Sequence, residues 1–424
     1  MNKREVISMW KVISSKMFWL YAVAVFAVLA IFSFAQIGAR NSVELKQLPI
    51  AVVNTSGNQQ SKKIISQLED KFSDSDAQLK LINVKKESSL KQGFTDKKYY
   101  GALVIDKDFD KSLTSQQNYL KGLVIQAKTK DVPEQAIAAN AQLKTQVQAA
   151  KTMTQTLPTQ AKIRVITNQG MNAQASSVVT TALPKIANAL SQGMSQKMQG
   201  VLKENNVTLS TAQWQVINAP IKVTTQTKNK LPNKSVSGMA PMLLVVLSWL
   251  SALISSIMLW REHKKRAENG RFNLSTINSQ MITGFVISIV ASLSIYFFAH
   301  VLFDVPVPDT GSFLLIVTFN IFIFYLIQTC ILNWAGFAGW PVLILVMLLS
   351  MGVISYPKEM LSPLFLNGIY SWTPLRFTMD WFTNNLYIHG SSVTSTTDFT
   401  VLISIGAIAL VLIYLSSLLK RKEK

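Results

Sequence analysis

The chain has 424 residues, of which 49% are hydrophobic and only 15% are charged, and its net charge is +20 at pH 7. So large an apolar fraction with so few charges argues against a fully soluble protein. The single cysteine, Cys330, excludes a disulfide framework and a thiolate metal cluster, and the three histidines are too scattered to predict a metal site.

The N-terminal residues 1–16 predict an amphipathic helix that lies on the cytosolic membrane surface. Residues 17–39 form the first long apolar run and follow several basic residues. A cleaved signal peptide is the alternative, but this run exceeds the roughly 7–15 apolar residues of such a signal. We therefore expect an uncleaved membrane anchor.

Five more apolar runs follow after a gap of about 200 residues, each close to the roughly 20 residues that a membrane-spanning helix needs. They cover residues 238–260, 281–303, 312–332, 338–355 and 399–419. Together with the first run they predict an α-helical integral membrane protein with six transmembrane helices, one before the gap and five in a domain over 238–424.

The orientation follows from the basic residues of the short loops, which stay in the cytosol. The loop "WREHKKRAENGR" after the second run and the C-terminal "LLKRKEK" are basic, whereas "DVPVPDTG" after the third run is acidic and rich in proline. We expect both termini in the cytosol of a multi-pass plasma membrane protein. Residues 40–237 then form a large extracellular domain, on a bacterial cell of the Gram-positive type.

The first part of this domain, residues 45–132, alternates strand-like with helix-like segments. Strands are predicted at 48–54, 79–84, 100–106 and 121–129, and helical segments at 61–72, 89–99 and 109–113. Such alternation is typical of an α/β layer with partly parallel strands.

Residues 133–205 are rich in alanine, glutamine and serine and predict a helical insert. We expect two long antiparallel helices over 134–157 and 176–205, joined by a link over 156–170. Residues 206–237 then return as a strand over 214–227 and a linker.

Basic side chains dominate the second half of the extracellular domain, where Glu204 is the one acid between residues 135 and 237. Two interpretations stay open: a solvated cationic surface, or attraction to an anionic cell-wall polymer or to membrane lipid headgroups. Nucleic acid is not an expected partner, because no platform of interleaved aromatic residues is evident.

Several motifs resemble one family when they are taken in chain order. "LPIAVVNTSG" followed by "YYGALVIDKDFDKSL" resembles the outer domain of the YhgE/Pip-like (phage infection protein) branch of the type-2 ABC transporter permease superfamily. "NAPIKVTTQTKNKLPNKSVSGMAPMLLVVLSWLSALI" is similar to the entry into that family's second span, and "YSWTPLRFTMDW" to its re-entrant turn. The helical insert is shorter than in many relatives, and "SWLSAL" lacks a commonly expected glycine.

The resemblance bears on residues 356–390, which are too interrupted by prolines to cross a bilayer. Backbone at membrane depth must be buried in protein or line a cavity, so we expect two short re-entrant helices in the outer leaflet, with Tyr370, Trp372 and Trp381 at the membrane interface. A loop lying on the headgroups is the alternative. In type-2 ABC permeases such a segment forms the outer lid. The resulting candidates for the lid or the translocation path are Asn320, Gln328, Pro363, Tyr370, Trp372, Pro374 and Arg376.

Asn320, Gln328 and Asn333 are the mild polar groups inside a span, where they either line a path or form hydrogen bonds between helices. The spans contain no evident acidic or basic residue at their centres, which disfavours an ion-coupled transporter.

The resemblance implies the membrane permease subunit of an ABC exporter for an amphiphilic or polymeric substrate, paired as a homodimer or heterodimer. The sequence has no "GxxxxGK[ST]" phosphate loop, so we expect neither enzyme activity nor a cofactor in this chain, but a separate ATP-binding subunit. The candidates for docking that subunit follow the second span: Glu262, Lys264, Lys265, Arg266 and Glu268. Anchoring on the cytosolic side explains the three basic residues equally well.

The main alternative function is a cell-surface receptor, or an envelope-assembly or secretion-system membrane protein, that does not transport. Such a protein should tolerate charge reversal at Glu262 or Glu268 and fail when its outer domain is deleted.

Overall fold

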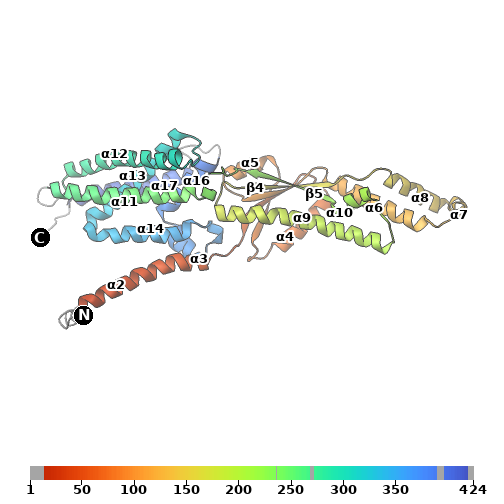
Figure 1. The fold of residues 1–424 in the computed structure, drawn as a ribbon, viewed down its shortest axis with the longest axis horizontal. Coiled ribbons are helices and arrows are strands. Elements are labelled where there is room, and N and C mark those ends of the chain that lie inside the picture. The colour runs from red at the N-terminus through yellow and green to blue at the C-terminus, as the bar shows by residue number, and fades with distance from the viewer. Residues whose placement is uncertain (1–13, 235, 268–271, 389–395, 419–424) are drawn as a thin grey trace. The chain divides into compact units, whose positions relative to one another are not determined.

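The computed structural model describes residues 14–234, 236–267, 272–388 and 396–418. It divides the chain into two compact units. The membrane unit comprises Met1–Glu44 and Leu231–Lys424, and the sheet unit comprises Leu45–Lys230 (Figure 1). The predicted interfacial helix over residues 1–16 lies almost wholly outside the described residues.

The sheet unit contains one five-stranded sheet with the strand order β2-β1-β3-β4-β5. Its strands are β1 (Leu48–Asn54), β2 (Leu79–Asn83), β3 (Gly101–Ile105), β4 (Ala161–Asn168) and β5 (Ile221–Lys228). β1 pairs in parallel with both β2 and β3, β3 pairs antiparallel with β4, and β4 pairs in parallel with β5. The partly parallel α/β layer is therefore confirmed.

The central strands β1 and β3 are buried along nearly their whole length. Helices pack against the sheet, so apolar side chains are needed on both sides of these strands, and an unbroken run such as "GALVI" meets that need. The helices of this unit are α4 (Gln59–Lys71), α5 (Ser88–Thr95), α6 (Phe109–Thr129), α7 (Glu134–Ala139), α8 (Ala141–Thr154), α9 (Ala173–Glu204) and α10 (Thr211–Asn218).

Three local predictions for this unit are wrong. Residues 121–129 are the end of α6 rather than a strand, because the buried Gln116, Tyr119 and Leu123 of α6 repeat at the helical spacing of three and four residues. The expected link over 156–170 contains β4, a strand inside the sheet. The expected strand over 214–227 begins with α10 and becomes β5 only at Ile221.

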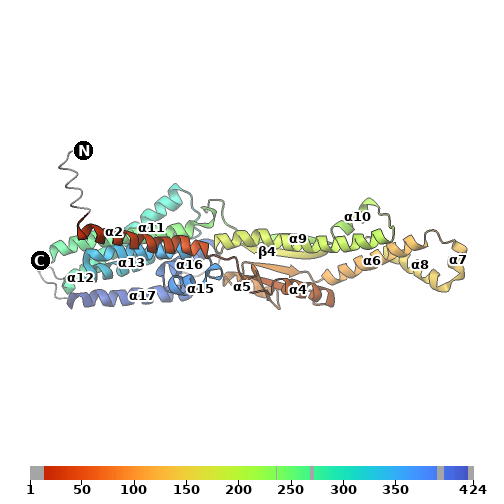
Figure 2. The same ribbon diagram turned by 90° about the horizontal axis from the view of Figure 1, so that it is seen from below.

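The expected pairing of the two long helices is also wrong. α8 packs against α6, whereas α9 packs along β4 and β5 and against α10. Figures 1 and 2 show α9 running beside the strands and α8 beside α6. β4 separates α8 from α9 in the sequence, so the chain returns to the sheet before α9 begins.

A bidentate ion pair joins β4 to α5. Arg164 donates to both carboxylate oxygens of Glu87, at 2.8 Å and 2.7 Å. The hydrogen bonds from Arg164 lower the pKa of the Glu87 carboxyl below its usual value.

The membrane unit has a helix at each of the six apolar runs. The first is α2 (Lys16–Ser33), which continues through the π-helix Phe34–Gly38 into α3 (Ala39–Asn41). The others are α11 (Ala240–Arg266), α12 (Leu274–Tyr296), α13 (Thr310–Ala335), α14 (Trp340–Ile354) and α17 (Thr396–Leu415). α12 continues as the π-helix Phe297–Leu302, and α17 ends in the short 3-10 helix Ser416–Leu418.

Four continuous helical stretches of the described residues are long and apolar enough to cross a membrane: Ala240–Arg266, Leu274–Leu302, Thr310–Ile354 and Thr397–Leu418. The third stretch contains two helices, because Gly336 has φ +66° and begins a 3-10 turn, Gly336–Gly339, between α13 and α14. The left-handed backbone at Gly336 favours glycine and interrupts the helix.

α13 is the central helix of the membrane unit. It packs against α11, α12, α14 and α17, and its apolar side chains are buried on several faces. α14 packs against α16 (Pro374–Tyr387) and against the π-helix after α2, where the Gln36 amide donates to the Leu348 carbonyl. By contrast, Trp19 and Phe26 of α2 are exposed, as expected for side chains that face lipid or another membrane helix.

Candidate functional site

Residues 356–388 of the proline-rich segment form short helices rather than one span. A 3-10 turn, Lys358–Met360, is followed by α15 (Pro363–Phe365), the π-helix Leu366–Tyr370 and then α16. Pro363 and Pro374 each stand in the first turn of a helix, where the missing N–H of proline costs nothing. The two prolines therefore start the two helices instead of breaking a longer one.

α16 is tied to its neighbours at its start and along its buried face. The Thr373 hydroxyl accepts from the Leu375 N–H at 3.4 Å and shares a hydrogen bond of 2.5 Å with Ser350 of α14. One turn further on, the Thr378 hydroxyl donates to the Asn320 side-chain oxygen of α13 at 2.7 Å. Two different helices thus hold α16 through buried hydroxyl groups.

The two tryptophans of this segment have different surroundings. Trp372 is 47% exposed, which suits the predicted position at a membrane interface. Trp381 is only 2% exposed and packs edge-on against Phe319 and Phe399, with ring centroids 5.3 Å and 5.6 Å away. The prediction that Trp381 belongs to an interface belt is therefore wrong, because α16 turns this ring into the core.

Arg376 lies between two aromatic rings. Its guanidinium carbon is 4.1 Å from the ring centre of Phe377 and 4.9 Å from that of the half-buried Tyr370. Cation–π contacts of this kind hold a charged group in place without neutralising it. The buried Arg376 Nε finds no hydrogen-bond acceptor among the described residues. One donor of this side chain therefore has no partner in the part of the chain that the structure describes.

Asn320 and Gln328 are both fully buried in α13. The Asn320 amide donates to the Ile316 carbonyl at 2.8 Å while its oxygen accepts from Thr378. The Gln328 amide donates to the Trp249 carbonyl of α11, and its oxygen accepts from Ser256, both at 3.2 Å. Of the two sequence interpretations, the structure places both residues in hydrogen bonds between helices.

A second polar cluster joins α12 to α13, and it contains Asn333, which the sequence predicted to form hydrogen bonds between helices or to line a path. The side chains of Gln280 and Asn333 exchange hydrogen bonds of 3.4 Å and 3.1 Å. The Tyr325 hydroxyl donates to the backbone carbonyl of Gln280 at 3.0 Å. Sequence reasoning missed Gln280, the partner of Asn333, because Gln280 stands one residue before the predicted third apolar run.

An apolar cavity of about 750 Å³ lies between α11 and α12. Leu244 and Leu247 line it from α11, and Ala291 and Ile295 from α12. Its small and branched side chains present a surface suited to a hydrocarbon chain.

Residues 16–416 match the sequence model of the ABC-2 family transporter proteins. The chain belongs to this family. Neither the curated proteins nor the solved structures contain a match to the chain. Membership makes the protein the membrane component of a transporter, and its helices make it a multi-pass membrane protein. Members of the ABC-2 family act in general with an ATP-binding subunit.

The predicted docking residues of this ABC-2 transporter protein lie in the last turn of α11 and beyond. Glu262 pairs with Arg266 at 2.9 Å and lies 3.9 Å from Lys265. The Lys264 amine lies 4.9 Å from the ring centre of Trp260. Glu268 lies outside the described residues. Basic residues also interact favourably with the C-terminal end of a helix dipole.

Proposed function

We propose that this chain is the permease subunit of an ABC-2 exporter, which pairs with a second permease subunit and takes its energy from a separate ATPase. The family match over residues 16–416 carries the proposal. The apolar cavity between α11 and α12 favours an amphiphilic substrate, and a polymer with a lipid anchor is one such substrate. We assign the chain to the YhgE/Pip-like branch because the order of its motifs resembles that branch.

The proposed mechanism couples the docking residues to α16 through buried hydrogen bonds. α11 carries the docking residues at its end, Gln328 ties α11 to α13, and Asn320 ties α13 to α16. A movement of α11 driven by the ATPase would therefore displace α16, which we propose as the outer lid. In this lid the guanidinium group of Arg376, held against Tyr370 and Phe377, would bind an anionic group of the substrate once movement of α16 uncovers it. Pro363 and Trp372, both exposed, would face the lipid or the path.

The docking proposal predicts that Glu262→Lys uncouples the two subunits. The substitution removes the one acid among the described residues of the last α11 turn and leaves only like charges there. We expect the yield of co-purified ATP-binding subunit to fall by about tenfold, because like charges brought together across an interface are strongly unfavourable. The yield is measured by quantitative mass spectrometry of the tagged protein in mild detergent.

Glu204→Lys is the matched control, since it makes the same charge change at the exposed end of α9. Retention of the ATPase by Glu262→Lys would contradict the docking assignment. If the unaltered protein co-purifies with envelope or secretion components and with no ATPase, the result would instead favour the receptor or assembly function.

We further propose six spans, with both termini in the cytosol and the sheet unit outside. In a Cys330→Ser background, we expect an impermeant maleimide to label Ser73→Cys of the sheet unit in intact cells. Lys265→Cys at the end of α11 should react only after the cells are permeabilised. Both side chains are exposed, so access depends on the side of the membrane. The reverse labelling pattern would place the sheet unit in the cytosol.

A further inference from the structure

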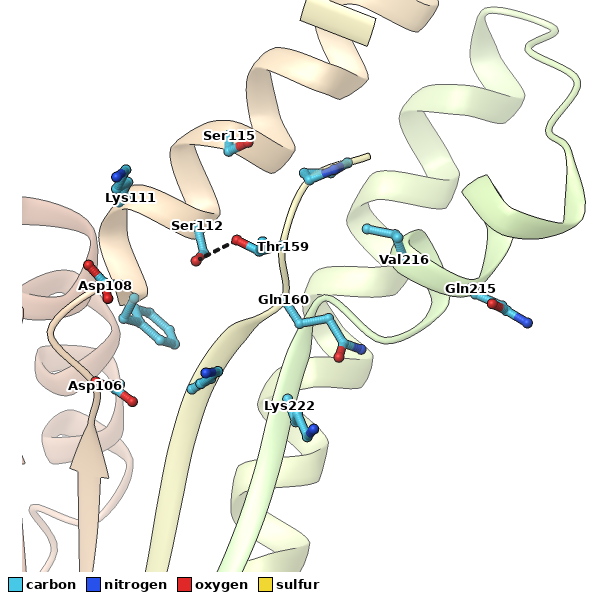
Figure 3. A pocket seen from close by; sticks show the side chains of 13 residues that line it. Asp106, Asp108, Lys111, Ser112, Ser115, Thr159, Gln160, Gln215, Val216 and Lys222 are labelled. Atoms are coloured by element: carbon cyan, nitrogen blue, oxygen red, sulfur yellow. Dashed lines mark hydrogen bonds between the residues drawn. The ribbon is translucent and has the colours of Figure 1, made fainter. Parts of the chain in front are cut away.

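A polar groove follows the first turns of α6 within the sheet unit. It consists of two adjoining cavities of about 810 Å³ and 960 Å³, which share Lys111 and Ser115 of α6 in their linings. Figure 3 shows the first cavity, with side chains of α6 on one side and residues at the starts of β4 and β5 on the other. We call the two cavities together the α6 groove.

The α6 groove lies at the edge of the sheet where a ligand crevice is expected. The chain runs from β1 outward to β2 and then returns to β3 on the other side of β1. α4 begins after β1 and α6 after β3, and Asp110 of α6 accepts from the Ser61 N–H of α4 at 2.8 Å. In α/β sheets, ligands bind outside the carboxyl ends of parallel strands at such a reversal of strand order.

Three lysines from three different elements line the first cavity: Lys111 on α6, Lys162 on β4 and Lys222 on β5. Lys162 and Lys222 are register partners in neighbouring parallel strands, so their side chains leave the same face of the sheet. Like charges in that position repel each other. None of the three lysines forms an ion pair with a carboxylate of the described residues. An anionic ligand would relieve this repulsion.

The rest of the lining is rich in hydroxyl and amide groups. Ser112, Thr159 and Gln160 line the first cavity, and Asn58 and Asn118 line the second. Such groups donate and accept hydrogen bonds without carrying charge, as a ligand with many hydroxyls requires. Asp106 and Asp108, which also line the first cavity, provide acceptors for hydroxyl groups.

We propose that the α6 groove binds a segment of an anionic polyol or sugar chain joined by phosphate groups. A phosphate lies against Lys162, Lys222 and Lys111, and the hydroxyls of the chain follow the polar face of α6. The site does not depend on transport by the membrane unit, so it stands whether or not the proposed export function holds.

The test measures binding of a poly(glycerol phosphate) oligomer to the full chain in nanodiscs of a zwitterionic lipid. We expect Lys162→Gln with Lys222→Gln to weaken binding by about tenfold, as the loss of two charge-assisted contacts implies. Lys197→Gln with Lys203→Gln removes the same charge from exposed positions on α9 and should change the affinity little. Equal weakening by both pairs, or no binding to the unaltered chain, would overturn the proposal.

Two more comparisons distinguish binding in the α6 groove from nonspecific attraction to the positive charge of the whole protein. Ser115→Trp fills the groove at constant charge and should weaken binding, whereas Ser177→Trp at an exposed position of α9 should not. Neutral dextran and polyglutamate should each bind more weakly than poly(glycerol phosphate). If polyglutamate binds as tightly as poly(glycerol phosphate), hydroxyl groups of the ligand do not contribute to recognition. If Ser115→Trp binds poly(glycerol phosphate) as tightly as the unaltered chain, the binding site does not lie in the α6 groove. Circular dichroism confirms that each variant is folded.

Discussion

Gly284→Ala should strongly destabilise the membrane unit. A Cβ atom at this position in α12 would lie 2.0 Å from Cε1 and 2.4 Å from Cζ of the Tyr325 ring. Tyr325 is 1% exposed, so its ring cannot move aside without displacing other core groups. Overpacking of a core costs about 1–3 kcal/mol, and loss of the buried Tyr325–Gln280 hydrogen bond adds to this cost. We expect a lower unfolding temperature of the detergent-solubilised protein by fluorescence.

Gly311→Ala is the matched control, because its added Cβ would meet only an ordinary contact of 3.8 Å with Asp309. A second substitution, Tyr325→Leu, should recover part of the stability lost in Gly284→Ala by making room for the methyl group. Equal unfolding temperatures for Gly284→Ala and Gly311→Ala would show that α12 and α13 do not pack this closely.

Separating Asn320 from Thr378 should free α16 from α13. Thr378→Val or Asn320→Leu alone leaves one buried polar partner unsatisfied, whereas the double substitution removes both. We expect a coupling free energy of about 0.6 kcal/mol in a double-mutant cycle, the average for hydrogen bonds between membrane helices, for which the largest values reach about 1.7 kcal/mol. Each single variant should also reduce ATP hydrolysis stimulated by transport, because the proposed lid no longer follows α13.

Ser294→Ala provides the control for this cycle. Its hydroxyl donates to the Val290 carbonyl of the same helix, and among the described residues it forms no hydrogen bond to a second helix. Strictly additive effects of the Asn320 and Thr378 substitutions on stability would show that the two side chains do not interact. If the two substitutions are coupled in their effects on stability but ATPase stimulation is unchanged, the hydrogen bond between Asn320 and Thr378 exists but takes no part in the proposed mechanism.

Local pattern was sufficient for most helices and for the first three strands. The segment 48–54 has the unbroken apolar run of a central strand, and the long apolar runs formed helices because a run of this length favours one. Pattern failed at 121–129, where "LVI" suits a strand and a buried helix face equally well. It also failed at β4, whose partners β3 and β5 lie far from it in the sequence.

The candidate site was predictable in its segments but not in its contacts. Three prolines and an arginine marked residues 356–388 as unusual, and the short helices were expected there. Nothing in the sequence indicated that Thr378 would meet Asn320, 58 positions earlier, or that Trp381 would enter the core. A single polar residue in an apolar run indicates that a partner exists, without indicating which one.

The sequence by itself determined that the chain has long apolar helices and a separate α/β region, because both follow from the spacing of apolar residues over a few turns or strands. Only the tertiary structure decided which distant side chains meet. Lys162 and Lys222 become neighbours because β4 and β5 pair in parallel, and Gln280 reaches Asn333 because α12 packs on α13. Register and packing depend on the summed contacts of whole elements, which no local stretch of sequence contains.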